Sequence, residues 1–550
     1  MSDREFNLLK EKWIKVMHPD GTVEELSMLE VFRDAHLYRR LAGELPTQGV
    51  AVLRVLLAVL HAVFAAYDQD GNFVELHSPG EALARWKGLW ERVTFPFEII
   101  EAYLLHFEER FYLFHPERPF YQVPEMGKAT QYTAAKLNGV LAESANKLRL
   151  FPVRTKEDRS RLSHAEAARW LIYVNSFDDT SAKPSVRGAS MPSPGAGWLG
   201  KLGLIYATGD NLFETLLLNL VLARSAGQDI WGEEKPTWEA EQPRTEERTE
   251  VPLPDNLSEL YTLQSRRLLL EREGDFVTGY LLLGGDFFSK ENALVEQMTA
   301  WQVNSRNDAA GYQPRRHDPA RQMWRDFPSL FAQGDEVVRP GIVEWLALLR
   351  SLSFIRSARF RFQIAGVKYG DKDFFVDDVM SDSITFNGEL LTALGETWMN
   401  RIVTEIKSID LLAGQAGQLA RSLSKAAGND GGEDQRSMAK EQAYFRLDLP
   451  FRAWLANIDP AETDLDTACD AWWNEARAIV RKLGADLVRD AGPRAFVGRT
   501  VKEKNKARRY TAAESYNWFL IRTSSRDALK GGDGNGTRGE DGGTVRQASD

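Results

Sequence analysis

The stretch LTALGETWMNRIVTEIKSIDLLAGQAGQLARSL, residues 391–423, carries an apolar side chain at every third or fourth position. Because this period puts the apolar side chains on one face, we predict a long amphipathic helix. Similar patterns predict helices over residues 438–458, with a kink at Pro450, over 465–487 and over 511–522. Four helices with short connections are typical of a helical bundle.

The chain ahead of this bundle mixes helical and strand patterns. Residues 13–26 alternate around a turn at 18–21, which predicts a hairpin. Ser27, with Glu30 three residues later, has the spacing of a helix-capping box. Further patterns predict helices over 50–64 and 82–114, a charge-rich linker over 227–248, and strands over 260–304 and 360–379.

These patterns predict an α+β fold in three parts. A large mixed N-terminal domain of irregular fold is expected over residues 1–385 and a four-helix bundle over 386–525. The glycine-rich, polar residues 526–550 are predicted to be a disordered tail. A chain of 550 residues is also too long for one compact core.

Composition narrows the functional classes. A net charge of −10 argues against a general nucleic-acid binder, so any DNA contact must come from local basic groups or from partners. The single cysteine, Cys469, excludes an internal disulfide and a multi-cysteine zinc site, and indicates a reducing, cytoplasmic setting. Residues 50–66 are the longest apolar stretch, but Arg54 and His61 interrupt it, so we expect a buried helix rather than a membrane span.

The sequence shows no recognisable catalytic arrangement. Residues 195–200 match the glycine spacing of a dinucleotide-binding loop, but no strand precedes them, so an ordinary loop is favoured. Asp377, Asp378 and Asp382 could bind Mg²⁺, yet carboxylates without a nearby basic or histidine partner are more often solvated. We therefore predict a protein that is not an enzyme and uses no cofactor or metal.

Two basic clusters could contact phosphate groups or be ordinary solvated surface, and composition leaves both interpretations open. The first begins at Arg149 and includes Arg154 and Lys156. The second comprises Lys502, Lys504, Lys506, Arg508 and Arg509, and its solvated alternative is a loop between two helices of the bundle. Residues 181–197 are rich in proline, glycine and serine, and a loop of this length inside a compact domain is uncommon unless it is functional.

Three segments of the first half are similar to a known family. They are FNLL, WI and RRLAGELP (residues 6–9, 13–14 and 39–46), FYLFHPERPFYQ (111–122) and GDNLFETLLLN (209–219). Together they resemble the large subunit of the type I-E CRISPR Cascade complex, the CasA family. The resemblance follows residues 5–525 in order and is most specific in the first 220.

The resemblance implies a subunit of a crRNA-guided surveillance complex. Such a subunit recognises the protospacer-adjacent motif in double-stranded DNA, promotes duplex opening and R-loop formation, and helps to recruit a helicase-nuclease. Its partners would be the other Cascade subunits, the crRNA and the target duplex. Base pairing between the guide RNA and the target strand would recognise most of the target sequence. A metal-dependent nucleic-acid-processing enzyme is the alternative.

The resemblance also implies roles for particular residues. The family's minor-groove loop corresponds best to Ser185, Val186, Arg187 and Gly188, its lysine finger to Lys290, and its duplex-opening wedge to Asp371, Lys372 and Asp373. Composition alone would make Lys290 an ordinary surface lysine, and relatives often carry glutamine where this chain has Lys372. Phe151, Arg154 and Lys156 correspond to a loop that meets the crRNA and neighbouring subunits. The cluster from Lys502 to Arg509 remains a candidate contact to the DNA backbone.

Overall fold

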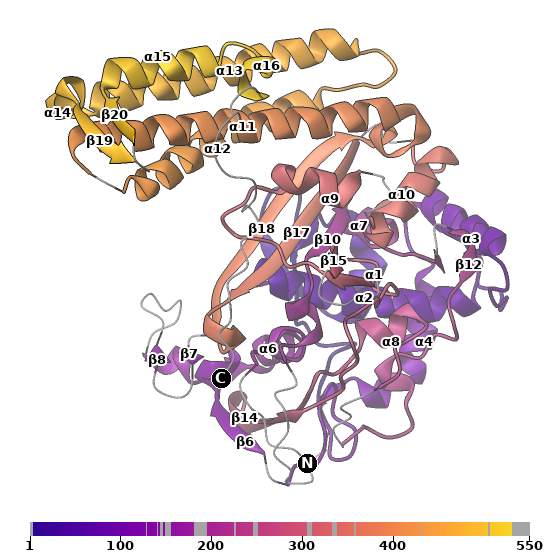
Figure 1. Cartoon of the computed structure of the whole chain (residues 1–550). Helices are drawn as coiled ribbons and strands as arrows, with labels where there is room; N and C mark the ends of the chain where they lie inside the picture. Colours follow the sequence, from indigo (N-terminus) through magenta and orange to yellow (C-terminus); the bar gives the residue numbers. More distant parts are fainter. Residues whose placement is uncertain are drawn as a thin grey trace. The chain divides into compact units, whose positions relative to one another are not determined.

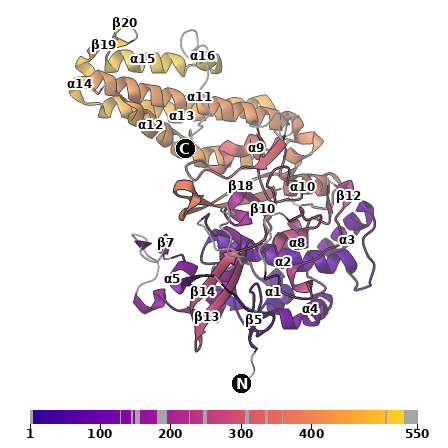
Figure 2. The ribbon, with the colours of Figure 1, turned by 60° about the horizontal axis from the view of Figure 1, so that its bottom comes forward.

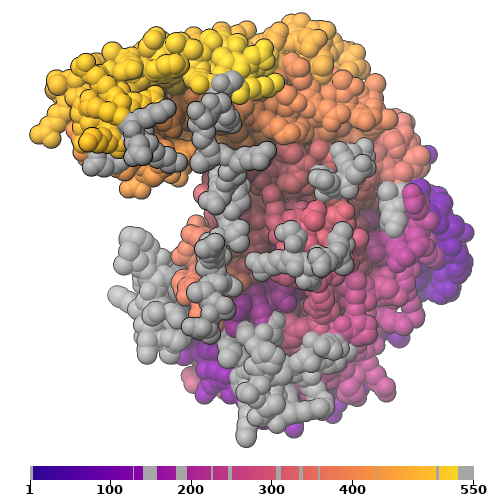
Figure 3. Space-filling model, viewed as in Figure 1, coloured from indigo at the N-terminus to yellow at the C-terminus, as the bar shows by residue number. Residues whose placement is uncertain are grey.

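The computed structural model describes most of the chain, and residues outside the described ranges are grey in Figure 3. Described are residues 4–127, 129–139, 141–143, 147–148, 156–180, 195–224, 227–245, 251–304, 311–332, 338–356, 359–429, 431–503 and 506–530. Contacts divide the chain into a unit of helices and strands, Met1–Thr392, and a mainly helical unit, Ala393–Asp550. The predicted α+β class is confirmed. The boundary predicted after residue 385 lies inside strand β18 (Val376–Asn387).

The helices of the first unit include a buried one, α2 (Pro46–Ala66), and others that pack against it. They are α1 (Met28–Asp34), α2 (Pro46–Ala66), α3 (Pro79–Arg92), α4 (Phe97–His106), α5 (Ala134–Leu137), α6 (His164–Phe177), α7 (Leu212–Leu218), α8 (Leu257–Tyr261), α9 (Phe327–Phe331) and α10 (Gly341–Ser351).

The strands of the first unit form several small antiparallel sheets rather than one large sheet. They are β1 (Glu5–Asn7), β2 (Ile14–Met17), β3 (Val23–Leu26), β4 (Arg40–Leu41), β5 (Tyr112–Phe114), β6 (Thr130–Thr133), β7 (Leu141–Glu143), β8 (Lys147–Leu148), β9 (Leu162–Ser163), β10 (Leu204–Thr208), β11 (Ala223–Arg224), β12 (Asp229–Ile230), β13 (Arg266–Glu273), β14 (Phe276–Gly284), β15 (Trp301–Asn304), β16 (Gly311–Pro314), β17 (Arg359–Tyr369) and β18 (Val376–Asn387).

Two of these sheets matter most for the site described below. The long strands β17 and β18 form a hairpin, and β10 pairs with the other edge of β17 (Figure 1). Along β17, Phe360 and Phe362 are buried while Arg359 and Arg361 are exposed, the alternation expected of a half-buried strand. The second sheet has the order β13–β14–β6, with β9 also paired to β14, and its β13–β14 hairpin is visible in Figure 2.

Helix α2 is the central helix of the first unit. It is apolar on all sides, so burial rather than a single amphipathic face is expected to stabilise it. By length and composition alone α2 could cross a membrane, but 83% of its most apolar window is buried inside the protein. The Arg54 guanidinium makes two hydrogen bonds of 2.8 Å to the Glu296 carboxylate, and both side chains are buried. The prediction of a buried helix is confirmed.

The second unit is built around one long helix. α11 (Glu396–Ala427) packs against α12 (Glu433–Ala456), α13 (Leu465–Asp490) and α15 (Ala512–Arg522). The shorter elements are α14 (Gly492–Val497), β19 (Arg499–Glu503), β20 (Lys506–Tyr510) and α16 (Arg526–Lys530). Gly428, at φ 116°, ends α11 in a left-handed conformation that glycine adopts without strain. The predicted bundle helices are confirmed, and α12 continues through Pro450.

The local signals near the N-terminus are also confirmed. β2 and β3 pair antiparallel, with Ile14 opposite Leu26. The Ser27 hydroxyl accepts a hydrogen bond from the Glu30 backbone N–H, and the Glu30 carboxylate accepts one from the Ser27 N–H. This reciprocal capping satisfies two N–H groups at the start of α1.

Two predictions for the first unit are wrong. Residues 82–114 are not one helix: α3 ends at Val93, which is left-handed with φ 63°, Pro96 precedes α4, and strand β5 follows. Residues 227–248 are not a linker between domains, because their described part packs onto the first unit through Trp238, which is 3% exposed. The many charged residues of this segment led us to predict a solvated linker, although the Trp238 indole is buried.

Two predictions for the second unit also need correction. The basic cluster from Lys502 to Arg509, expected as a loop, is the hairpin β19–β20. The predicted tail begins too early, since residues 526–530 form α16, with Leu529 buried and Arg526 bonded to the carboxylates of Glu405 and Asp470. The remaining tail residues lie outside the described part of the chain.

Candidate nucleic-acid interface

The two ends of the loop predicted to be functional are held together in the first unit. The Arg266 guanidinium donates to the carbonyl oxygens of Asp179, at 2.7 Å, and Gly195, at 2.9 Å, and also binds the Asp178 carboxylate. The Gly197 N–H donates to the Asp178 carbonyl at 2.9 Å. Residues 178–180 and 195–197 therefore form a fixed stem. Ser185, Val186, Arg187 and Gly188 lie outside the described residues.

Close backbone packing explains the glycines that follow this loop. A Cβ on Gly197 would lie 2.4 Å from the Ser176 carbonyl oxygen, and one on Gly200 would lie 2.0 Å from the Tyr369 hydroxyl. That hydroxyl donates to the Phe177 carbonyl at 2.7 Å, which joins β17 to the end of α6. The dinucleotide-like spacing of residues 195–200 therefore reflects packing. A short 3₁₀ turn, Trp198–Lys201, follows Gly197, and this arrangement is not a strand–helix junction.

The tip of the β17–β18 hairpin contacts the same stem. Thr180 donates from its N–H to the Asp373 carbonyl, at 3.0 Å, and from its hydroxyl to the Lys372 carbonyl, at 2.7 Å. Arg316 makes hydrogen bonds of 2.9 and 2.8 Å to the two Asp373 carboxylate oxygens, and its guanidinium lies 4.9 Å from the Tyr369 ring centre. These contacts fix the tip from two other segments of the chain.

The backbone of this tip is strained. Lys372 has φ 50° and ψ 25°, and Asp373 has φ 61°. Left-handed conformations cost a residue with a side chain on the order of 1–2 kcal/mol each. The contacts from Thr180 and Arg316 offset this cost, so the exposed Lys372 side chain projects from a turn of defined shape.

Lys290 lies in a segment whose aromatic residues pack beside the stem. Phe287 and Phe288 are each 8% exposed, and the Phe288 ring centre lies 4.3 Å from that of Trp198. The Trp198 indole N–H in turn donates to buried Glu296 at 2.8 Å. Lys290 itself is exposed. The sequence-predicted loop stem, lysine and hairpin tip are thus connected to one another within the first unit.

Three cationic residues at this site, Lys201, Arg266 and Arg316, were not predicted from the sequence. The Lys201 ammonium lies 5.2 Å from the Phe287 ring centre and forms no ion pair with the described residues. Burial, followed by repulsion from Arg266, Lys290 and Arg316, lowers the pKa of Lys201 to about 8, so it remains mainly protonated at neutral pH. Two signals in the sequence could have indicated these cations. Lys201 lies just after the loop, and Arg266 is a charged residue at the start of an apolar strand.

The second basic cluster lies in the other unit. On β19–β20, Val501 pairs with Arg508 and Thr500 with Arg509. Lys502, Arg508 and Arg509 are exposed, and strand alternation puts Arg508 on the face opposite to that of Arg509. The Arg508 guanidinium lies 5.2 Å from the Tyr510 ring centre. Lys504 lies outside the described residues, as does the side chain of Lys506.

The remaining predicted residues do not add to the site. Lys156 begins a short 3₁₀ turn, and Phe151 and Arg154 lie outside the described residues. Asp377 pairs with Lys368 at 3.0 Å, and Asp382 accepts from the Met323 N–H at 2.7 Å. These local partners account for two of the three carboxylates considered for Mg²⁺.

The family model for CRISPR-associated protein Cse1 matches residues 7–483. The chain belongs to the Cse1 family. A curated CasA/Cse1 protein of Thermus thermophilus is 31% identical over 337 residues, a match that covers 60% of this chain and 61% of that protein. The chain thus spans about 61% of the length of this curated relative. The predicted resemblance to the CasA family, the large subunit of Cascade, is confirmed.

Solved structures agree with this assignment. Cse1 of Thermobifida fusca is 32% identical, with a TM-score of 0.81, and the match covers 96% of this chain and 98% of that one. Cse1 of Acidimicrobium ferrooxidans is 26% identical, with a TM-score of 0.76, and 95% and 99% are covered. A chain of a CRISPR RNA-guided surveillance complex shares the fold of this Cse1-family protein at 19% identity, with a TM-score of 0.63 and coverage of 95% and 100%.

Proposed function

We propose that this Cse1-family protein is the large subunit of a crRNA-guided type I-E surveillance complex. In this role it recognises the protospacer-adjacent motif in double-stranded DNA, promotes duplex opening and R-loop formation, and helps to recruit a helicase-nuclease. Its partners are the other Cascade subunits, the crRNA and the target duplex. It acts by binding and not by catalysis.

One observation carries the proposal. The stem of the loop, the Lys290 segment and the β17–β18 tip come from distant parts of the sequence, yet Arg266, the Trp198–Phe288 contact and the Arg316–Asp373 pair connect them. A protein that reads a short duplex mark needs several contacts held in a fixed relation. A merely solvated set of loops would not require these connecting contacts.

The chemistry of the site suits the minor groove of DNA. Minor-groove edges present mainly purine N3 and pyrimidine O2 acceptors, to which the Lys290 ammonium can donate. Lys201, which forms no ion pair with the described residues, adds local positive charge to a chain whose net charge is −10, whereas Arg266 and Arg316 are balanced by Asp178 and Asp373. The negative remainder of the protein limits binding to arbitrary DNA, because non-specific affinity depends on the number of phosphates neutralised.

The two basic clusters predicted from the sequence contact nucleic acid or neighbouring subunits in this proposal. Lys502, Lys504, Lys506, Arg508 and Arg509 contact the DNA backbone, and Phe151, Arg154 and Lys156 meet the crRNA and neighbouring subunits. Backbone contacts add affinity and orientation without sequence information. Lys372, projecting from the strained tip, acts beside the first base pair that opens.

The experiment is reconstitution of the crRNA-containing assembly with and without this chain. Gel-shift titrations compare a target duplex that carries the adjacent motif with one whose motif is scrambled. We expect discrimination between the two duplexes only when the chain is present. Equal discrimination without the chain would refute the proposal, and cleavage of DNA by the pure chain with Mg²⁺ would favour a nucleic-acid-processing enzyme instead.

A further inference from the structure

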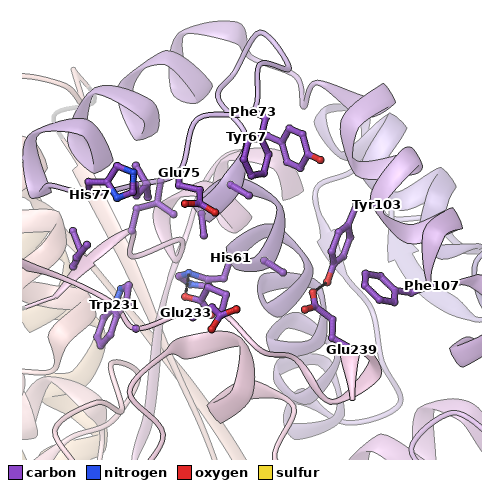
Figure 4. A pocket seen from close by; sticks show the side chains of 18 residues that line it. His61, Tyr67, Phe73, Glu75, His77, Tyr103, Phe107, Trp231, Glu233 and Glu239 are labelled. Carbon is purple, nitrogen blue, oxygen red and sulfur yellow. Dashed lines mark hydrogen bonds and ion pairs between the residues drawn. The ribbon is translucent and has the colours of Figure 1, made fainter. Parts of the chain in front are cut away.

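A second site lies elsewhere in the first unit, beside helix α2. A pocket of about 550 Å³ lies between the C-terminal half of α2, the segment after it, α4, and residues 230–239. Figure 4 shows the side chains that line it. This volume falls within the range of small-molecule sites, about 300–1,000 Å³. The pocket shares no residue with the candidate nucleic-acid interface.

The pocket is acidic. Its described lining includes Glu75, Glu233, Glu234 and Glu239 but no lysine or arginine. The Glu234 side chain is 5% exposed, and its carboxylate accepts a hydrogen bond of 2.7 Å from the Ser258 N–H. Burial raises the pKa of Glu234 to about 7 and also raises the pKa of Glu239. Glu233 pairs with Lys235 at 2.6 Å, and Glu239 accepts a hydrogen bond of 2.5 Å from the Tyr103 hydroxyl. Among the described residues, Glu234 has no lysine or arginine partner, although a buried acid usually has one.

His61 supplies an independent sign of a ligand. Its side chain is 1% exposed and lines the pocket, and neither ring nitrogen has a hydrogen-bond partner among the residues that the structure describes. The Nδ1 atom lies 3.8 Å from the Glu234 carboxylate, beyond hydrogen-bond distance. Burial lowers the pKa of His61 to about 3, so the ring is neutral and cannot balance the carboxylates. A neutral imidazole can instead accept a hydrogen bond from a bound donor.

Aromatic rings complete the wall. Tyr67, Phe73, Phe107 and Trp231 line the pocket, and the Tyr67 and Phe73 rings meet edge to face at 5.5 Å (Figure 4). Aromatic faces attract organic cations and pack against their carbon stems. The described residues contain no group of three or more His, Cys, Asp or Glu side chains that could hold a metal ion. The lining therefore fits an organic cation better than a metal.

We propose that this pocket binds an alkylammonium or guanidinium cation, with its charged head at the buried carboxylates and its carbon stem along the aromatic wall. Such a cation donates hydrogen bonds to Glu234 and Glu239 and offers a donor to His61. Two sources have this chemistry, a free linear polyamine and a lysine or arginine side chain of a protein partner.

Calorimetric titration of the full chain tests the cation. Butylguanidinium is compared with butylurea, which has a similar shape but no charge. We expect butylguanidinium to bind and butylurea to bind about tenfold more weakly or not at all, because charge-assisted hydrogen bonds are the stronger kind. Equal affinities for the two compounds, or no binding of butylguanidinium, would overturn the proposal.

Variants test the location. Glu234→Gln keeps the side-chain shape but removes its charge, and we expect it to weaken butylguanidinium binding about tenfold. The matched control is Glu462→Gln, an exposed residue outside the pocket that should bind as the wild type does. Unchanged binding by the Glu234→Gln variant would refute the assignment.

A measurement without ligand shows whether this variant remains folded. Between pH 4.5 and about 7 the folded chain holds a proton on Glu234 that the unfolded chain has released. The stability of the wild type therefore falls as pH rises through this window, whereas that of Glu234→Gln does not fall on this account. His61 stays neutral here, and Asp255 adds repulsion. A gap between the two melting temperatures that widens with pH is expected; a constant gap would contradict the buried, uncompensated charge.

Two further probes distinguish the sources. A linear triamine that binds more tightly than a blocked Gly-Arg-Gly peptide indicates a free polyamine, and the reverse order indicates a partner side chain. Failure of both probes would count against the pocket as a cation site. None of these outcomes depends on the binding of DNA, so they are independent of the function proposed above.

Discussion

The β17–β18 hairpin ends in a tip held by Thr180 and Arg316, whereas β19–β20 carries exposed basic side chains on both faces. The first hairpin keeps a strained turn in one shape. The second is fastened near its base, where the Arg499 guanidinium donates to the Lys425 carbonyl at 2.8 Å. Fixed shape serves discrimination between duplexes, and exposed charge serves affinity for phosphate. The two hairpins should therefore fail in different ways when altered.

The largest effect is expected at Arg316, a positioning residue for the β17–β18 tip. Arg316→Ala removes both hydrogen bonds to the Asp373 carboxylate and releases the tip. We expect the affinity of the assembled complex for motif-bearing duplex to fall about tenfold or more, because the strained turn loses a contact that holds its shape.

Gel shifts with motif and scrambled duplexes measure this effect. Affinity for the scrambled duplex should barely change, so the ratio between the two affinities collapses. Arg316→Lys keeps the charge but lacks the planar group that lies over the Tyr369 ring, and it should restore only part of the ratio. Equal losses on both duplexes would show that Arg316 acts by charge, as the β19–β20 residues are proposed to do.

Lys290→Ala should have the next largest effect. Loss of a minor-groove donor is expected to cost about 1–2 kcal/mol for motif-bearing duplex, within the range for a good base contact. Lys407→Ala, which removes an exposed lysine of the second unit, is the matched control. If both variants bind equally well in gel shifts, Lys290 is not a base contact.

The β19–β20 hairpin should respond to salt rather than to sequence. Replacing Arg508 and Arg509 by alanine removes two phosphate contacts, so motif and scrambled duplexes should lose affinity by the same factor. The slope of log affinity against log salt should become shallower by about 1–2. Titrations at several salt concentrations measure the slope, and an unchanged slope would remove this hairpin from the interface.

The smallest effect is expected at Lys372. Lys372→Ala should weaken binding of motif-bearing duplex about two- to fivefold, since an exposed charge adds about 0.5–1 kcal/mol. Lys372→Gln should retain most of the opening activity, because side-chain bulk at a fixed tip rather than charge separates the base pairs. Permanganate footprinting of the opened strand measures this step. A larger loss for Lys372→Gln than for Lys372→Ala would contradict it.

Sequence reasoning succeeded where structure depends on neighbouring residues. The apolar period of residues 391–423 and the Ser27–Glu30 box are local signals, and both were confirmed. It did not predict the β19–β20 hairpin, because many residues of this segment are charged and have low strand propensity. It also failed at Val93 and Pro96, which divide an otherwise helical pattern.

The candidate site was predictable only in part. The family resemblance pointed to Lys290 and to the turn at Lys372. Lys201, Arg266 and Arg316 come together only through tertiary packing across segments fifty or more residues apart, and no spacing in the sequence reports this proximity. Likewise, Trp238 and Glu234 were hidden inside a stretch whose composition resembles a linker.

The stem closed by Arg266 has a consequence for how this fold can diversify. The two ends of the intervening chain are already side by side, so closing a longer or shorter segment there costs little entropy, about 0.6 kcal/mol for a doubling of length. The sequence and length of residues 181–194 can thus change while the helices and strands around the stem keep their fold.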